Sequence, residues 1–164
     1  RSSDGGVDVI YWGAASLGDV PVPGDYDGDG KTDAAVFRRS NGYWFLKLSG
    51  NDQTVSKLWG LGTDVPVAAD YDGDGKTDIA VWRGSDTNWY IIRSSNKAVE
   101  TKSWGAASLG DVPVPGDYDG DGKTDVAVWR ESTGTWYVKC SSDDSVRSKA
   151  LGQSGDSPVA ARKN

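Results

Sequence analysis

Hydrophobic residues occur in short runs along the chain, and clusters of Gly, Asp, Asn and Ser separate one run from the next. No stretch keeps the i, i+3, i+4 spacing of apolar residues that an amphipathic helix requires. The runs are rich in aromatic and β-branched residues, which is typical of strands. In runs such as Val-Ala-Val-Trp (residues 126–129) consecutive positions are apolar, so we expect both faces of these strands to be buried. The pattern predicts an all-β protein.

The pattern repeats three times. The segment Asp-Tyr-Asp-Gly-Asp-Gly-Lys-Thr-Asp occupies residues 25–33 and returns unchanged at 70–78 and 117–125. A second marker keeps the same period of about 45 residues: it is Trp-Gly from Trp12, Trp59 and Trp104, and Leu-Gly from Leu151. Each unit contains four strand-like runs. They are residues 19–26, 34–38, 43–48 and 54–60, then 65–71, 79–83, 88–93 and 98–105, and finally 111–118, 126–130, 135–140 and 145–152.

A period of this length with four strands per unit is typical of a β-propeller blade, because neighbouring blades cover both faces of each sheet. We therefore predict blades of four antiparallel strands, three of them complete, with additional terminal strands. Within a single repeat domain (1–164), residues 1–13 form an entering fourth strand, 14–60, 61–105 and 106–152 the three blades, and 153–164 the first strand of a further blade. Three blades do not close a ring. The chain is thus either part of a longer propeller or a homo-oligomer that completes one between chains.

The composition of the chain argues against several classes of function. The formal net charge of −6 argues against a nucleic-acid partner, and no apolar run reaches the roughly 18 residues of a membrane span. The chain has no His, so the commonest general base is missing and we expect no catalytic site and no enzyme activity. Cys140 is the single cysteine, and we expect a small buried or edge thiol there. The chain begins at Arg1 rather than Met, which indicates a processed product or an excised piece.

The repeated acidic segment carries the strongest chemical signal. Its four Asp residues alternate with small or turn-forming residues, and its sixth position is a Gly that permits a sharp bend. Four like charges this close repel one another unless something neutralises them, and a solvated turn offers no neutralising partner. Calcium takes about six to eight oxygen ligands, which alternate carboxylates in a curled loop can supply. Each copy is therefore predicted to bind a divalent cation.

The first six positions match the start of an EF-hand loop, but Val36, Val81 and Val128 stand where its bidentate Glu belongs. Instead, an Asp at position nine is followed directly by a strand. This pattern resembles the calcium loops of FG-GAP (VCBS-type) repeats, the blades of integrin-α-like propellers, and Trp-Gly resembles the Phe-Gly of that family. The resemblance covers the whole chain and implies three structural Ca²⁺ ions, with each Lys binding through its carbonyl while its ammonium group faces water. The implied ligands are Asp25, Asp27, Asp29, Lys31, Asp33, Asp70, Asp72, Asp74, Lys76, Asp78, Asp117, Asp119, Asp121, Lys123 and Asp125.

The resemblance also implies that partners approach the end of the blades opposite the calcium loops. Repeated Arg with Asn, Thr or Asp at that end could bind sugar hydroxyls, or the Arg could simply cap turn carbonyls. The candidate ligand-binding residues are Arg38, Asn41, Tyr43, Arg83, Asp86, Asn88, Arg130 and Thr133. Two aromatic columns, Trp44, Trp89 and Trp136 with Phe37, Trp82 and Trp129, could likewise present flat faces to sugars, but packing between blades is the favoured interpretation.

Three functions remain open. The first is a calcium-stabilised, lectin-like module that binds glycans at a cell surface, and the second is an adhesion or scaffold propeller that binds a cell-surface protein. The third is a non-catalytic accessory domain of a secreted hydrolase. Loops of this kind in extracellular modules bind calcium at ~10⁻⁴–10⁻³ M, so we expect a secreted or cell-surface location. The second-to-third strand loops differ among the units, which weakens the glycan hypothesis.

Overall fold

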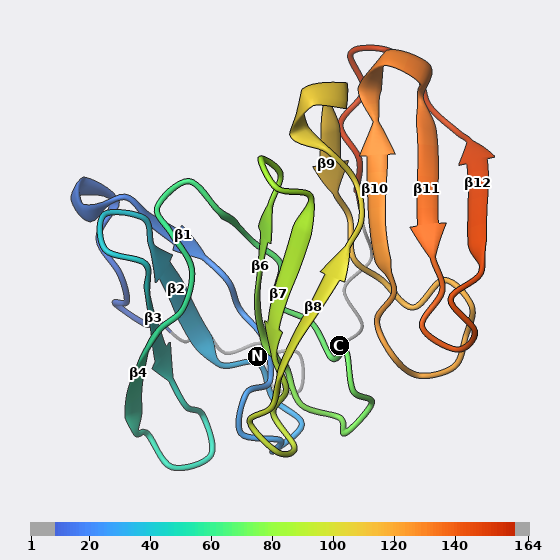
Figure 1. Ribbon diagram of the computed structural model, residues 1–164. Helices are drawn as coiled ribbons and strands as arrows, with labels where there is room; N and C mark the ends of the chain where they lie inside the picture. The colour runs from blue at the N-terminus through green and yellow to red at the C-terminus, as the bar shows by residue number, and fades with distance from the viewer. Residues whose placement is uncertain (1–8, 160–164) are drawn as a thin grey trace.

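The computed structural model describes residues 9–159, and in this range it forms three four-stranded antiparallel sheets (Figure 1). We call them blade 1, blade 2 and blade 3. Blade 1 contains β1 (Asp19–Pro21), β2 (Ala34–Arg38), β3 (Tyr43–Lys47) and β4 (Thr54–Leu58); blade 2 contains β5 (Val65–Pro66), β6 (Ile79–Arg83), β7 (Asn88–Ile92) and β8 (Val99–Ser103); blade 3 contains β9 (Asp111–Pro113), β10 (Val126–Arg130), β11 (Thr135–Lys139) and β12 (Val146–Ala150). Short 3₁₀ turns are η1 (Ala15–Leu17), η2 (Ala107–Leu109) and η3 (Glu131–Thr133). The predicted all-β fold with four-stranded blades is confirmed.

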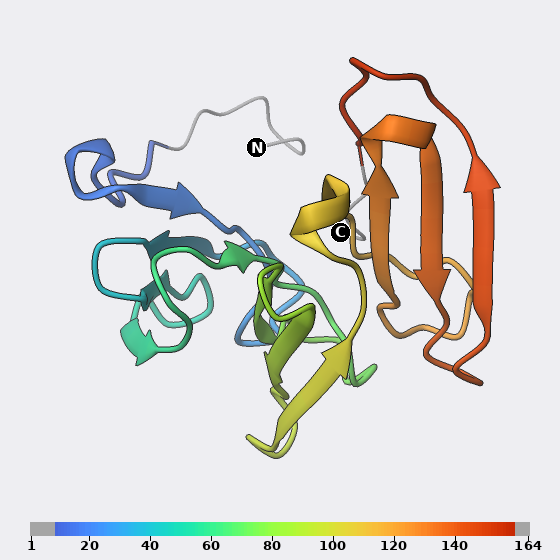
Figure 2. The same ribbon diagram turned by 45° about the horizontal axis from the view of Figure 1, so that its top comes forward.

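The strands of each blade follow one another in sequence order, and the blades lie side by side in an arc that is not closed (Figures 1 and 2). The first strands are shorter than the sequence predicts, since β1 ends at Pro21 rather than continuing to residue 26. Pro lacks the N–H that a strand ladder needs. Beyond the proline, an isolated bridge between Gly24 and Asp33 closes the acidic loop, and equivalent bridges close the other two.

Both predicted terminal strands lie partly outside the described residues, namely at 1–8 and 160–164. Their described parts, residues 9–13 and 153–159, form no strand. In each blade, the fourth strand pairs with the third strand, and the first strand pairs with the second strand. The described part of the chain offers neither partner to these segments, so their backbone has no ladder to join.

Among the described residues, two hydrophobic clusters lie at the junctions between blades, and a third lies within blade 3. One cluster joins Phe37 and Trp44 of blade 1 to Val81 of blade 2, and a second joins Trp89 of blade 2 to Val128 of blade 3. The two aromatic columns are therefore packing residues, as the favoured interpretation held. Because no described sheet covers the far side of blade 3, Trp136 is only half-buried there.

Tryptophan indoles also link neighbouring blades through hydrogen bonds. Trp59, at the end of blade 1, donates its indole N–H to the carbonyl of Tyr90 in blade 2 at 3.0 Å. Trp104, at the end of blade 2, makes the same bond to Tyr137 in blade 3 at 3.0 Å. The Trp of the repeated Trp-Gly marker thus forms a hydrogen bond that links its blade to the next one.

Candidate metal centres and an inter-blade pocket

The first Asp of each acidic loop holds the loop in its curled shape. In loop 1 (residues 25–33), one carboxylate oxygen of Asp25 accepts the N–H of Gly28 at 2.6 Å and the other accepts that of Gly30 at 2.8 Å. Both glycines have positive φ angles, 82° and 81°, which residues with a Cβ rarely adopt. The same two bonds recur in loop 2 (residues 70–78) and loop 3 (residues 117–125). The glycines of the motif are therefore needed for the backbone to wrap around the carboxylate.

The curled loops gather their carboxylates into compact groups. In each group, one oxygen atom per residue lies within 4.8 Å of the oxygen atoms of the others. The groups are Asp25, Asp27 and Asp29 in loop 1, Asp70, Asp72 and Asp78 in loop 2, and Asp117, Asp119 and Asp121 in loop 3. An all-oxygen, multiply charged donor set of this kind fits a hard cation such as Ca²⁺, and so the donor chemistry agrees with the predicted metal sites.

The ninth residue of each loop is buried at its base. Asp78 accepts backbone N–H groups from Tyr71 at 2.9 Å and Ser94 at 2.6 Å, and Asp33 and Asp125 accept equivalent pairs. Burial raises the pKa of Asp78 to about 6, with the charge of Asp72 adding to the shift. A cation held beside this carboxylate would favour its ionised form and so oppose the effect of burial.

The turn between the third and fourth strands completes each acidic loop, which sequence analysis missed. In blade 2, the hydroxyl of Ser94 donates to Asp74 at 2.6 Å and that of Ser95 to Asp72 at 2.6 Å. Blade 3 repeats both bonds, and in blade 1 a serine hydroxyl and a glycine N–H take these places. The signal was present in the sequence, because a Ser directly follows the third strand-like run of every unit.

The lysines of the loops behave differently from one another. Lys31 places its ammonium nitrogen 3.1 Å from Asp29 of its own loop. The expectation that every ammonium group faces water is wrong for Lys76, whose Nζ donates to the carbonyl of Asp27 in the neighbouring loop at 2.9 Å. Blade stacking brings the two loops together, and the backbone oxygen of loop 1 replaces water as the acceptor. Neither contact tests whether the lysine carbonyls bind metal.

At the opposite end of each blade, an arginine and a buried aspartate form a two-bond ion pair. Arg83 donates Nε and Nη2 to the two oxygens of Asp64 at 2.8 and 2.9 Å, and Arg38 with Asp19 and Arg130 with Asp111 do the same. The hydrogen bond from Arg38 lowers the pKa of Asp19. Sequence analysis missed these aspartates, although each stands just before a Val-Pro pair in all three units. Each ion pair links the first strand of its blade to the second strand.

We expect Asp64→Asn to lower the free energy of unfolding by about 2 kcal/mol, because the buried pair would lose its charge-assisted bonds. The side chain of Asp64 is fully buried, whereas Arg83 remains partly exposed. The measurement is urea-induced unfolding followed by tryptophan fluorescence. Asp86→Asn is the matched control, since Asp86 lies 3.7 Å from the same Arg83 but is more exposed. An equal loss in both variants would contradict the structural role of Asp64.

The candidate ligand-binding residues lie in these ion pairs and in the adjoining turns. Asn41 and Asp86 each accept the N–H of the residue two positions later, and the carbonyl of Thr133 accepts the Thr135 hydroxyl. Asn88 and Asp86 both hydrogen-bond to the hydroxyl of Tyr90. Tyr43 stacks against Phe45 at 6.0 Å between ring centroids. The structure thus gives these residues local roles and does not test whether they bind a ligand.

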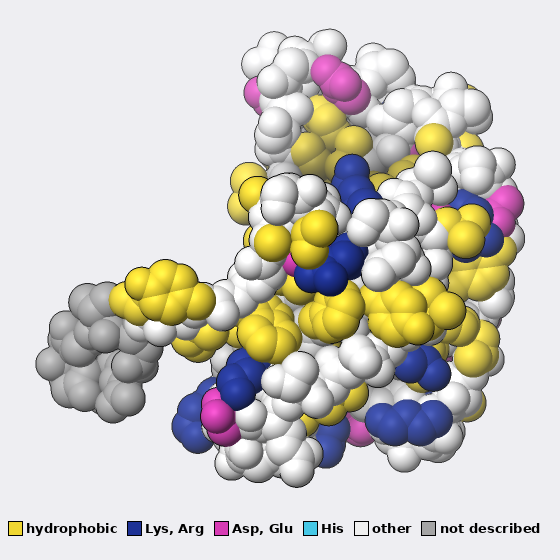
Figure 3. All heavy atoms as spheres, turned by 90° about the vertical axis from the view of Figure 1, so that its left-hand side faces the viewer, with side chains coloured by type: hydrophobic (Ala, Val, Ile, Leu, Met, Phe, Trp, Pro, Cys, Tyr) yellow, Lys and Arg dark blue, Asp and Glu magenta, His cyan; other side chains and the backbone are white. Residues whose placement is uncertain are grey.

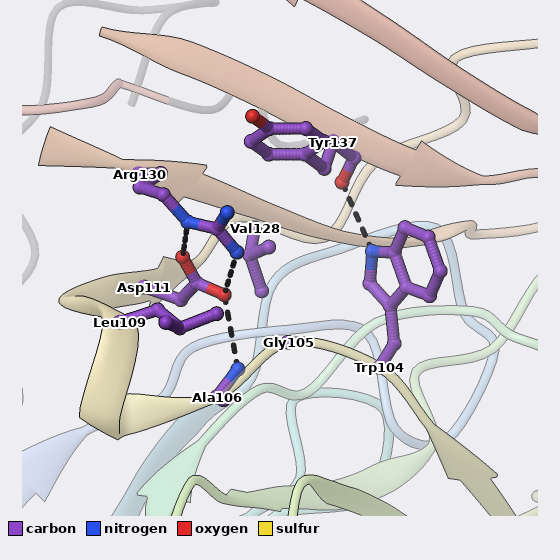
Figure 4. A pocket seen from close by; sticks show the side chains of 8 residues that line it. All are labelled: Trp104, Gly105, Ala106, Leu109, Asp111, Val128, Arg130 and Tyr137. Carbon is purple, nitrogen blue, oxygen red and sulfur yellow. Dashed lines mark hydrogen bonds and ion pairs between the residues drawn. The ribbon is translucent and has the colours of Figure 1, made fainter. Parts of the chain in front are cut away.

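The junction of blades 2 and 3 contains a pocket of about 200 Å³ at this end (Figure 4). The guanidinium carbon of Arg130 lies 4.7 Å from the centre of the Tyr137 ring, and its nitrogens bond to Asp111. Leu109 of η2 and Trp104 contribute apolar surface. The pocket therefore combines an aromatic ring, a cation, a carboxylate and aliphatic surface in a small space.

Comparison with known proteins identifies one family. The family described as FG-GAP-like repeat matches residues 25–81 and 70–128, and together these segments cover more than half of the chain. No curated protein and no solved structure matches. Among the described residues, no helix is long and apolar enough to cross a membrane.

Proposed function

The chain belongs to the FG-GAP-like repeat family, and on this premise we propose that it is a calcium-stabilised recognition module that acts outside the cell and binds glycans. The carboxylate groups of the three loops support the calcium part of the proposal. Calcium sites of extracellular modules commonly have dissociation constants of ~10⁻⁴–10⁻³ M, which suits a calcium-rich medium.

Calcium would be held by the carboxylate groups described above, which are Asp25, Asp27 and Asp29 in loop 1, Asp70, Asp72 and Asp78 in loop 2, and Asp117, Asp119 and Asp121 in loop 3. Its charge would neutralise carboxylates that otherwise repel one another. The serines after the third strands already hold several of these carboxylates by hydrogen bonds, so they would orient the ligands. In this proposal the ions are structural and stiffen the link between the first and second strands.

We propose a binding role rather than a catalytic one. The chain lacks His, and the carboxylates that cluster closely are those assigned to calcium. Cys140, the remaining nucleophile of note, is buried as expected in the hydrophobic cluster of blade 3, close to Asp119 and Asp125 of loop 3, and this agrees with a packing role.

The glycan part of the proposal rests on the pocket between blades 2 and 3. The Tyr137 ring and the side chain of Leu109 could cover the apolar face of a sugar ring, while the partly exposed guanidinium of Arg130, held in place by the buried Asp111, offers N–H donors for its hydroxyl groups. Arg83 stacks on Tyr90 at 4.7 Å at the junction before it, and Arg38 on Phe45 at 4.4 Å. Repeated weak sites would gain from avidity on a multivalent surface.

A protein partner is the second candidate. The turns that connect the second and third strands differ in sequence from blade to blade, and blade 3 alone has a 3₁₀ turn, η3, at this position. An asymmetric surface of this kind suits a partner that contacts several blades at once better than three copies of one small ligand.

A glycan array in millimolar calcium, with a chelator-treated sample beside it, tests the proposal. We expect calcium-dependent binding to a related set of sugars, and we expect Leu109→Arg to weaken it about tenfold by filling the pocket. Leu58→Arg is the matched control, because Leu58 is equally exposed but lies on β4 away from the pocket. A blank array from folded, calcium-loaded protein would reject the glycan hypothesis and favour the protein partner.

A further inference from the structure

We propose that the chain associates head to tail with a second copy of itself, so that blade 3 of one copy docks against blade 1 of the next. The two inner junctions, between blades 1 and 2 and between blades 2 and 3, use one set of contacts. Blade 3 carries the first half of this set on its open face, the face turned away from blade 2. Blade 1 carries the second half on its own open face. The proposal does not depend on the glycan assignment.

The acidic loops supply the first contact. Across the inner junctions, Thr77 donates its backbone N–H to the carbonyl of Asp25 at 2.6 Å, and Thr124 donates to that of Asp70 at 2.7 Å. The preceding lysine lies over a glycine of the neighbouring loop: a Cβ on Gly28 would meet Cε of Lys76 at 2.7 Å, and one on Gly73 would meet Cγ of Lys123 at 3.0 Å.

At the two ends of the arc the same elements lack this packing. A Cβ added to Gly120 of loop 3 would have no described atom within 4 Å. On blade 1, the side chain of Lys31 is 71% exposed and Thr32 is exposed as well, whereas Thr124, its equivalent in blade 3, is buried. Lys31 and Thr32 of one copy therefore match the vacant position over loop 3 of another. The lysine and the acidic loop are also complementary in charge.

The hydrogen bond of the tryptophan indole at each junction also has one half at each end of the arc. Trp12 donates its indole N–H to the carbonyl of Phe45 on the open face of blade 1 at 3.1 Å, as Trp59 and Trp104 do on blades 2 and 3. In the third unit the equivalent residue is Leu151, which is 66% exposed. Leu151 is smaller than Trp and packs poorly on blade 3. Trp12 of a second copy could therefore occupy the tryptophan position at the open face of blade 3.

Apolar surface at the ends supplies the driving force. Tyr71, covered by blade 3, is 2% exposed, but the equivalent Tyr118 on the open face of blade 3 is 38% exposed. Trp136 is half-buried, while its counterparts at the inner junctions are fully buried. On the other side of the molecule, hydrophobic side chains form a row across blade 1 (Figure 3). Contiguous apolar surface of this kind is typical of interfaces.

One segment stands in the way of docking. Leu151 and residues 152–159 lie over Trp129 and Trp136 and leave a hollow of about 370 Å³ beside them. This segment joins no strand, and most of its residues are exposed. Segments with so few buried contacts move at low cost, so an incoming blade can displace it.

A second copy offers each open face the partner that the inner junctions use, because the two halves of the interface lie on blades 1 and 3 of the same chain. The two faces are unlike each other, so the contact is heterologous. Repetition of such a contact gives a closed ring if the rotation closes and a growing chain if it does not. Both products have a mass above that of the monomer.

The test is the mass of the calcium-loaded full chain, measured by light scattering and analytical ultracentrifugation over a wide range of concentration. We expect the mass to rise above that of a monomer, and Lys31→Glu to weaken association about tenfold because it places a negative charge against loop 3. Lys57→Glu on β4 is the matched control. It makes the same charge change at an exposed site on blade 1 and should leave association unchanged.

Calcium-dependent melting of each variant shows whether loop 1 still binds its ion. If Lys31→Glu alters that melting, Trp12→Ala replaces it as the variant of the open face. A monomer at every concentration would overturn the proposal, and so would an equal effect of the two charge reversals. In those cases further blades of a longer propeller, or a different partner, cover the open faces.

Discussion

Chelation of calcium is expected to lower the melting temperature by roughly 10 °C. Each site contributes about 1.4 kcal/mol when free calcium is about ten times its dissociation constant, so three sites contribute about 4 kcal/mol. For a chain of this size, 1 kcal/mol corresponds to about 2–4 °C. The physical reason is the repulsion among the clustered carboxylates, which calcium relieves in the folded loops and not in the unfolded chain.

The measurement is thermal unfolding by calorimetry, in millimolar calcium and after chelation. Asp27→Asn should remove about one third of the shift, because it weakens one loop of three. Asp52→Asn is the control, since Asp52 is highly exposed in a neighbouring turn and stands outside the carboxylate groups. An unchanged melting temperature on chelation would show that the loops do not bind calcium.

The second large effect concerns the core. Trp89→Ala should lower the free energy of unfolding by about 4 kcal/mol, as expected for truncation of a fully buried aromatic side chain. Its ring lies 6.5 Å from those of Tyr71 and Trp82, and its indole N–H donates to the carbonyl of Trp104 at 3.0 Å. Truncation would therefore open a cavity at the junction of blades 2 and 3 and leave a buried acceptor with one partner fewer.

Trp136→Ala is the matched variant, because Trp136 holds the same position in blade 3 and makes the same indole bond, to Leu151. It is half-buried, and so we expect about half the loss. Denaturant unfolding in calcium, at concentrations low enough to keep the chain monomeric, measures both values. Equal losses would show that Trp136 is as well packed in the monomer as Trp89, which would contradict the half-buried position described above.

Much of the site could be predicted from the sequence because its determinants are local. The Asp residues of each loop alternate along one short segment, and so curling that segment around glycines is enough to bring Asp25, Asp27 and Asp29 together. The apolar runs determined which strands are buried on both faces, and the repeat determined the number of complete blades.

Contacts between different strands and blades were harder to predict. The partner of Arg83 is Asp64, 19 residues earlier, and strand pairing alone brings the two together. The serines that hold the loop carboxylates come from a turn about 20 residues later, and the acceptor of Lys76 belongs to another blade. In each case the sequence shows the residue types, but many pairings of them are compatible with the same pattern.

The difference between what the sequence determines and what the tertiary structure determines is clearest in two segments of identical sequence, residues 12–33 and 104–125. The sequence determined the same loop in both copies, in which two glycines donate their N–H groups to the carboxylate of the first Asp. Tertiary structure decided the surroundings: Thr124 is buried against blade 2, whereas Thr32 is exposed at the end of the arc. Local geometry follows from the torsional preferences and hydrogen bonds of neighbouring residues. The burial of a side chain depends on whether a neighbouring blade packs against it. The position of each copy in the row of blades therefore decides which of its residues are buried.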